Sequence, residues 1–405
     1  MLPLLKKVFA FKCYILSTCL LLSVLLLGNV KFDDLSPGTS GLINCCWRFS
    51  HYESSIFESL WLENIEAWQH DICNKIAEPE HASLSEQIMF RILELKSGIE
   101  AYNQPDNNSI SVAAVTQPAD NLMSSLHYYQ ECSIGGGPAE YSRSGVQLIE
   151  PLWGMLRDPF DNTVCHNALT NPKMDGVRSQ SKEHLIPQGY APYAYYTNRT
   201  GNIQSDKWMF GGLPPWYNGG NCLTMSLSPQ SKPKNVFLDL GSAYFGSWRG
   251  SSNAASGEWF YNTYRHVGLH FSKFVAVEAE TLEPKEVYAQ IPDDLVGAYS
   301  LMNVPLTLDD SKLDIRKVIR SLATENDFFV IKLDIDSAPL EDPFAFLLLE
   351  DNGVAGLIDE MMFEHHVDIA PMRGIWGDGL SRNLKDSYGL FKGLRQKGIR
   401  AHSWP

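Results

Sequence analysis

The second half of the chain, from residue 234 onward, alternates short apolar runs with segments whose apolar residues recur at helical spacing. The apolar runs are rich in Val, Ile and Phe, as buried parallel strands are. Repeated strand, helix, strand units predict an α/β fold, namely a Rossmann-like, doubly wound, mostly parallel sheet over residues 235–405. Strands are predicted at 236–240, 274–277, 328–333, 357–363 and 399–404, and helices at 258–267, 313–323, 343–350 and 387–397.

The region before this sheet has a different pattern. Residues 54–77 carry apolar residues at helical spacing, and a second helix is predicted behind Ser83, whose capping partner is Glu86. Residues 103–234 are rich in Gly, Pro, Asn and Ser and show no sustained period. We therefore expect residues 54–234 to be helical first and then loop-rich, behind a short stem at residues 31–53.

The first 30 residues are predicted to insert into a membrane. Lys6, Lys7 and Lys12 precede an apolar run over residues 13–28. This run fits the core of a signal peptide, whereas residues 8–30 together are long enough for a transmembrane helix. Because no small-x-small cleavage site follows, an uncleaved signal anchor is favoured. The preceding lysines then predict a single-pass type II membrane protein whose body faces the ER or Golgi lumen; cleavage would make it secreted.

Two further features agree with a lumenal protein. Asn107 and Asn198 begin acceptor sequons for N-glycosylation. The cysteines beyond the apolar run are even in number, which suits disulfides in an oxidising compartment, although the pairing is open and buried free thiols are the alternative. They are Cys45, Cys46, Cys73, Cys132, Cys165 and Cys222. The net charge of −14 argues against nucleic acid as a partner, because phosphate binding needs clustered Lys and Arg.

Acidic residues stand at the ends of three predicted strands. The first strand ends in Asp239 and is followed by Gly241, which lets the backbone turn tightly and approach a ligand. The second ends in Glu278, where doubly wound folds hold the ribose hydroxyls of a nucleoside. In the third, Lys332 and Asp334 share one face because side chains alternate along a strand. Ligands of such sheets bind at these strand ends, so we expect a nucleoside-cofactor site there.

The segments VFLDLG, FVAVEA and FFVIKLDIDSAPLE, in this order and spacing, resemble the FkbM-type branch of class I S-adenosylmethionine-dependent methyltransferases. The resemblance covers residues 235–405 only. It implies that S-adenosyl-L-methionine is bound by Asp239, Gly241, Ser242 and Glu278, with Asp334 at the active-site end of the sheet. The turn after Gly241 departs from the family because bulky residues replace further glycines. An inactive binding protein that kept the fold is therefore one alternative.

Methyl transfer to a hydroxyl needs an aligned acceptor and a general base. Asp334 is the candidate for base or acceptor-orienting residue, and His366 is the second candidate. Alternation puts Glu364 and His366 on one face of their strand and His365 on the other. This strand alone therefore does not bring three metal ligands together, and no metal site is predicted. The expected acceptor is a glycan or small molecule with a hydroxyl or carboxyl group.

The other alternative is a metal-dependent glycosyltransferase. Anchored lumenal enzymes often belong to this class, and Asp334 and Asp336 form a D-x-D sequence behind a hydrophobic strand. Such a pair can bind a divalent cation that bridges the diphosphate of a nucleotide sugar. This interpretation gives Lys332 no evident role.

Overall fold

The computed structural model describes residues 43–81, 83–84, 87–88, 121–134, 140–152, 222–224, 234–248, 251–252, 257–266, 269–325, 327–369 and 380–403. The predicted anchor at 1–30, both glycosylation sequons and Cys165 lie outside these ranges. Within the described part of the chain, no helix combines the length and apolarity needed to cross a membrane.

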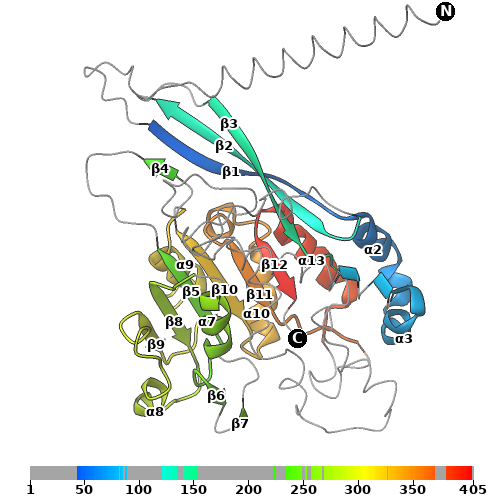
Figure 1. The fold of residues 1–405 in the computed structure, drawn as a ribbon. Helices are drawn as coiled ribbons and strands as arrows, with labels where there is room; N and C mark the ends of the chain where they lie inside the picture. Colours follow the sequence, from blue (N-terminus) through cyan, green and yellow to red (C-terminus); the bar gives the residue numbers. More distant parts are fainter. Residues whose placement is uncertain are drawn as a thin grey trace, which may run out of the picture.

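A six-stranded parallel sheet forms the centre of the second half of the chain (Figure 1). Its strands are β5 (Asn235–Leu240), β8 (Lys273–Val277), β9 (Tyr299–Met302), β10 (Phe328–Leu333), β11 (Glu360–Phe363) and β12 (Arg400–Ser403). Their spatial order is β12-β11-β10-β5-β8-β9. Counted from β5 in chain order, this is 3-2-1-4-5-6 when read from the β9 edge, the order typical of Rossmann sheets. The predicted α/β class is confirmed.

Helices cover both faces of the sheet. Alternate residues of the strands, such as Leu238 and Ile331, pack with α9, α10 and α13 in one core, and the residues between them, such as Phe237 and Val330, pack with α7 in a second core. The helices in the described part of this half are α7 (Gly257–His266), α8 (Pro284–Tyr288), α9 (Ile315–Leu322), α10 (Ala338–Leu347), α11 (Asn352–Ala355) and α13 (Leu384–Gln396). A two-stranded hairpin of β6 (Ser247–Trp248) and β7 (Ser251–Ser252) follows β5.

The short helices α8 and α11 and the short strands β6, β7 and β9 were not predicted, α10 begins earlier than predicted, and β11 begins later. Helix α10 begins at Ala338, five residues before the predicted start at Pro343, because Pro339 already occupies the first turn, where a missing N–H costs nothing. Strand β9 was not predicted, because only Tyr299 of its four residues is fully buried and the strand offers no apolar run. It lies at the edge of the sheet, which explains its half-exposed character.

A second sheet, antiparallel and four-stranded, has the order β3-β2-β1-β4. It consists of β1 (Ile43–Glu53), β2 (Ser124–Ile134), β3 (Glu140–Ile149) and β4 (Cys222–Thr224). The stem prediction for 31–53 is therefore wrong for residues 43–53, and the loop-rich prediction for 103–234 is wrong for β2, β3 and β4. These strands were not predicted because half-exposed strands carry polar residues among their apolar ones and so form no apolar run. In β1, a register shift after Phe49 also breaks the alternation of apolar and polar residues.

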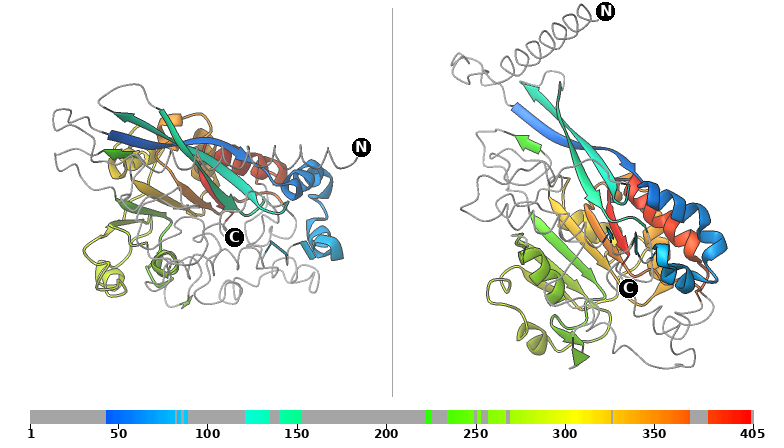
Figure 2. Two further views of the ribbon diagram at one scale, coloured as in Figure 1. Left: turned by 45° about the horizontal axis from the view of Figure 1, so that its top comes forward. Right: turned by 45° about the vertical axis from the view of Figure 1, so that its right-hand side comes forward.

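The predicted helix over 54–77 is interrupted. Helix α2 (Ile56–Trp68) has Gln69 as its C-cap residue, and α3 (Ile72–Ala77) follows after a turn. Ser55 caps α2 by accepting a hydrogen bond from the Glu58 amide. Trp61 and Ile65 of α2 are buried in the same core as α13, and the two helices lie side by side (Figure 2). The amino-terminal elements thus complete one face of the parallel sheet.

Buried charges link the two sheets. The Arg395 guanidinium on α13 lies 2.9 Å from Glu150 Oε1 just after β3. His402 Nδ1 on β12 lies 2.6 Å from the same oxygen, and its Nε2 lies 2.9 Å from Glu360 Oε1. All four side chains are buried. Because buried charges are tolerated only when they are paired, this network fixes the antiparallel sheet against the β11 and β12 edge.

Candidate functional site

The adjacent strands β5 and β10 mark the point where the strand order reverses, which is where ligands of doubly wound sheets bind. Asp239 on β5 is paired in register with Lys332 on β10. Both side chains are buried, and Lys332 Nζ lies 3.3 Å from Asp239 Oδ1. Burial raises the pKa of the Asp239 carboxyl, and the nearby ammonium group opposes this shift. The two strands therefore share a buried ion pair at the switch point.

Lys332 has two further partners in the same place. Its Nζ donates a hydrogen bond to the carbonyl oxygen of Gly241 at 2.8 Å and lies 3.2 Å from Asp334 Oδ2. Burial alone would lower the pKa of Lys332, but the carboxylates of Asp239 and Asp334 outweigh it and raise the pKa. Lys332 thus remains charged and ties the turn after β5 to the end of β10.

Position 241 requires a glycine because the backbone at the end of β10 lies very close to it. Its φ angle is +81°, a left-handed conformation that favours glycine. A Cβ atom at this position would lie 1.7 Å from the backbone oxygen of Asp334, which no rearrangement of a side chain could relieve. The predicted glycine turn is therefore present, but its immediate physical reason is backbone packing between two strand ends.

The amide groups of this turn are occupied within the protein. The N–H groups of Gly241 and Ser242 donate to the carbonyl of Val277 at the end of β8, at 3.0 and 3.1 Å. The Ala243 N–H donates to Glu278 Oε2 at 3.0 Å. Ala243 has a φ angle of +46°, an unusual conformation for a residue with a Cβ and one that clusters at functional sites. None of these three N–H groups is directed to an external ligand.

Glu278 follows β8 and is held in place by backbone contacts. Its Oε1 accepts from the Glu280 amide at 2.9 Å, and the Asn303 side chain donates to the Glu278 carbonyl at 2.8 Å. The Glu278 side chain is partly exposed, in contrast to Asp239. Each carboxylate oxygen has a second lone pair, so Glu278 can still accept hydrogen bonds from a ligand's hydroxyl groups.

The predicted residues Asp239, Gly241, Ser242, Glu278 and Asp334 therefore meet at one end of the sheet. Asp239 lies near the end of β5, and the others follow the ends of β5, β8 and β10, where β5 is the neighbour of both other strands. Direct ligand contact is open to Glu278, whereas Asp239 is only 1% exposed and faces Lys332. The sequence indicated the acids because acids at the ends of adjacent parallel strands converge. It did not indicate the role of Lys332, which is visible only in the pairing of β5 with β10.

A second group of acidic and imidazole side chains lies beyond the ends of β10 and β11. Asp336, Glu364 and His366 have potential metal-ligating atoms that all lie within 4.8 Å of one another. His366 Nε2 is 3.8 Å from Glu364 Oε2 and 3.9 Å from Asp336 Oδ1. Asp336 has a φ angle of +53° and is exposed, while Glu364 and His366 are buried. Asp336 follows β10, whereas Glu364 and His366 follow the neighbouring strand β11. The alternation of side chains along one strand therefore could not predict that these three residues lie together.

Glu341 on α10 supports this second group. Its Oε1 accepts from the Ile335 amide at 2.7 Å, and its Oε2 is buried without a hydrogen-bond partner. Burial raises the pKa of the Glu341 carboxyl to about 7. Burial alone would lower the pKa of His366, but the carboxylates of Glu364, Glu341 and Asp336 outweigh it and raise the pKa. The pKa of both Glu341 and His366 is thus raised, and a raised pKa favours a role in proton transfer.

His365 belongs to the opposite face, as its position in the strand predicts. Its Nδ1 lies 2.8 Å from the Ser387 hydroxyl on α13, and its Nε2 lies 3.1 Å from Asp342 on α10. The side chain is buried against these two helices and does not join Glu364 and His366. His365 thus has a packing role.

No family model, curated protein or solved structure matches this chain. The features that describe the protein are therefore those of its own structure, namely a Rossmann-like parallel sheet and an acidic site at the switch point of that sheet.

Proposed function

We propose that this chain is an S-adenosylmethionine-dependent methyltransferase of the secretory-pathway lumen that transfers a methyl group to a hydroxyl or carboxyl group of a glycan or small molecule. The observation that carries the proposal is the cluster of Asp239, Lys332 and Asp334 at the switch point, with Glu278 at the end of the neighbouring strand. The resemblance of these segments to FkbM-type methyltransferases supports the same assignment.

The hydrogen bonds of the turn after β5 favour a cofactor without phosphates. Dinucleotide-binding loops use free N–H groups to hold a pyrophosphate. Here the N–H groups of Gly241, Ser242 and Ala243 are engaged by Val277 and Glu278. S-adenosylmethionine has no phosphate and carries a sulfonium and an ammonium charge, which suits a site rich in carboxylates. The donor set of this site therefore fits S-adenosylmethionine better than a nucleotide diphosphate.

The residues around the site divide into cofactor-holding and acceptor-facing groups. Glu278 would bind the ribose hydroxyls, and the Asp239–Lys332 pair would hold the turn in place. S-adenosylmethionine supplies an electrophilic methyl group when it is bound. On the acceptor side, His366 takes the proton of the acceptor hydroxyl, and Glu364 stabilises the resulting imidazolium. Asp334 is fixed by Lys332 and acts as an orienting residue rather than as the base.

A metal-dependent glycosyltransferase is the second candidate, because Asp336, Glu364 and His366 offer a possible cation site. Asp334, the other half of the D-x-D sequence, contacts Lys332 and is not part of this group. The D-x-D pair thus does not form a joint ligand set as that function requires. The third candidate, an inactive binding protein, shares the cofactor site and differs only in turnover.

Thermal unfolding of the purified protein tests the proposal. S-adenosylhomocysteine at a hundred times its dissociation constant should add roughly 2.7 kcal/mol to the free energy of unfolding. Manganese with a nucleoside diphosphate should add nothing beyond the effect of manganese alone. Stabilisation by the manganese complex alone would contradict the methyltransferase proposal. Binding of S-adenosylhomocysteine without methyl transfer to any glycan acceptor pool would favour the inactive binding protein.

A further inference from the structure

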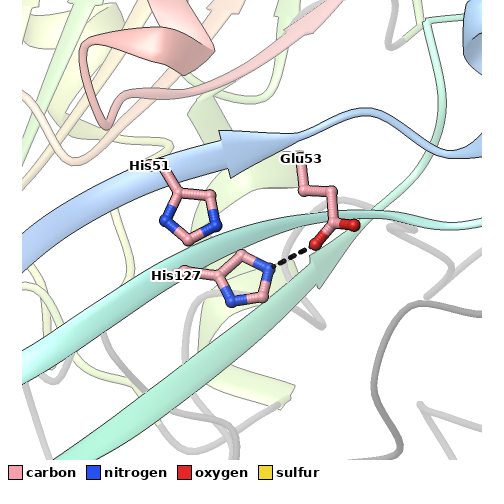
Figure 3. Close-up of side chains that lie close together, drawn as sticks. All are labelled: His51, Glu53 and His127. Atoms are coloured by element: carbon pink, nitrogen blue, oxygen red, sulfur yellow. Dashed lines mark ion pairs between the residues drawn. The ribbon is translucent and has the colours of Figure 1, made fainter.

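Another group of potential metal ligands lies in the first half of the chain, on strands β1 and β2 of the antiparallel sheet. His51 and Glu53 come from β1, and His127 comes from β2 (Figure 3). His51 and His127 are directly opposite each other in the antiparallel register. Glu53 lies two residues beyond His51, so it points to the same face of the sheet.

The ligand atoms of these three side chains converge. The imidazole rings of His51 and His127 are stacked, with centroids 4.4 Å apart and an angle of 6° between their planes. His127 Nε2 lies 3.1 Å from Glu53 Oε2. One ligand atom of each residue lies within 4.8 Å of those of the other two. To place all three atoms at about 2.0–2.2 Å from one ion, the stacked rings must turn so that their nitrogen lone pairs converge.

A β-bulge is responsible for the pairing of the two histidines. Phe49 is paired with Tyr128, and an unbroken register would place Ser50 opposite His127. The register shift between Phe49 and His51 inserts one residue, so that His51 takes the position opposite His127. Bulges re-aim side chains and are enriched beside functional sites. The local backbone thus brings two imidazoles together that regular pairing would separate.

Hydroxyl groups orient both rings. Ser50 Oγ lies 3.0 Å from His51 Nδ1, which leaves Nε2 of that ring as its ligand atom. Ser125 Oγ lies 2.9 Å from His127 Nε2, which is the same nitrogen that lies close to Glu53. Ligating histidines commonly carry a hydrogen bond on their second nitrogen, which fixes the tautomer and the orientation of the ring. His51 already has this arrangement.

We propose that His51, Glu53 and His127 bind a divalent transition-metal ion of the zinc type. Two imidazoles and one carboxylate suit zinc and copper, whereas magnesium and calcium require oxygen ligands. Three protein ligands leave one position of a tetrahedral ion open. Because Glu53 and His51 are exposed, this position faces solvent and accepts water or a ligand group from another molecule. The site is independent of the proposed methyl transfer.

Zinc titration of the full chain tests this inference. The protein is purified without a histidine tag, treated with a chelator and titrated with zinc against a chromogenic competitor. The test variants are His51→Gln and His127→Gln. His70→Gln, which changes an exposed histidine outside both ligand groups, is the matched control. His366→Gln disrupts the second ligand group found among the described residues and shows which of these two groups binds the ion.

The proposal predicts that His51→Gln and His127→Gln each bind one zinc ion fewer per chain than His70→Gln, or bind it at least tenfold more weakly. His366→Gln should leave this ion in place. Cobalt substitution should give visible d–d bands that His127→Gln loses. Equal zinc binding by His127→Gln and His70→Gln, or no zinc binding by the unaltered chain, would overturn the proposal.

Discussion

Lys332 is the residue on which the candidate site depends most. Its ammonium group is fully buried and contacts Asp239, Asp334 and the carbonyl of Gly241. Because Lys332 is paired with two acidic side chains, the cluster of Asp239, Lys332 and Asp334 carries a net negative charge. This charge is complementary to a cationic cofactor, and it also makes the strand ends dependent on the lysine for stability.

Replacing Lys332 by Met should therefore destabilise the protein. The variant leaves the Asp239 carboxylate buried without its counterion, which costs about 3–5 kcal/mol when one partner of a buried pair is removed. The measurement is the free energy of unfolding in urea. Lys312→Met, at an exposed position, is the control and should change it by less than about 0.5 kcal/mol. A loss below about 1 kcal/mol in Lys332→Met would show that the pair is not buried as described.

Glu341 gives a pH-dependent prediction. The pKa of its carboxyl is raised from the ordinary value of 4.5 to about 7, because burial penalises the charged form. The folded state therefore holds a proton that the unfolded state has lost, and stability falls as pH rises from about 4.5 to about 7. Above this window, Glu341→Gln should be more stable than the unaltered protein by about 1–3 kcal/mol.

The same substitution should have little effect at low pH. Near pH 4 the carboxyl is protonated in both states, so glutamine resembles it and still accepts the Ile335 N–H. Urea unfolding at pH 4 and pH 8 measures the difference, with the exposed Glu350→Gln as control. A stabilisation that is equal at both pH values would contradict the raised pKa.

At the scale of elements, the parallel sheet was predictable and the antiparallel sheet was not. Buried parallel strands such as β5 and β10 carry apolar residues at every position, so their runs stand out from the helices between them. Strands β1 and β2 mix polar with apolar residues, and the bulge after Phe49 breaks any regular alternation in β1. The same difference applies to the sites. Acids at strand ends were visible in the sequence, but the group of Asp336 with His366 depends on the adjacency of β10 and β11.

The antiparallel register also narrows the open disulfide pairing. Cys45 is the backbone partner of Cys132, and Cys46 is the backbone partner of Cys222. Opposed residues in antiparallel strands have Cα atoms about 4.5–5.5 Å apart, within the range that disulfides span. In an oxidising compartment we expect these two pairings.

Peptide mapping of the non-reduced protein by mass spectrometry checks these pairings. It should find a peptide containing Cys45 and Cys46 linked to the peptides of both Cys132 and Cys222. Linkage of either cysteine to Cys73 instead would contradict the register of β1.

At the scale of the whole molecule, the two sheets behave as parts of one folded unit. The core on one face of the parallel sheet includes Trp61 of α2 together with residues of α13. Arg395 joins Glu150 and lies 3.6 Å from Glu58, both of which precede the parallel sheet in the chain. The amino-terminal elements therefore cover surface that the parallel sheet would otherwise expose.

Arg395→Met tests this coupling. The substitution leaves Glu58 and Glu150 buried without the guanidinium, so we expect a loss of about 3–5 kcal/mol in a single cooperative unfolding transition. Arg265→Met removes an exposed ion pair with Asp294 and should change stability by less than about 1 kcal/mol. Two separate transitions, with only one of them shifted, would show that the sheets unfold independently.

The central claim, a nucleoside-cofactor site at the switch point, is tested most directly by calorimetric titration of the protein with S-adenosylhomocysteine. One molecule should bind per chain. Glu278→Gln should weaken binding at least tenfold, because the glutamine no longer offers two charged oxygens to the ribose hydroxyls, while Glu63→Gln on α2 should not affect it. Absence of binding to the unaltered protein, or equal binding by Glu278→Gln and Glu63→Gln, would contradict the account.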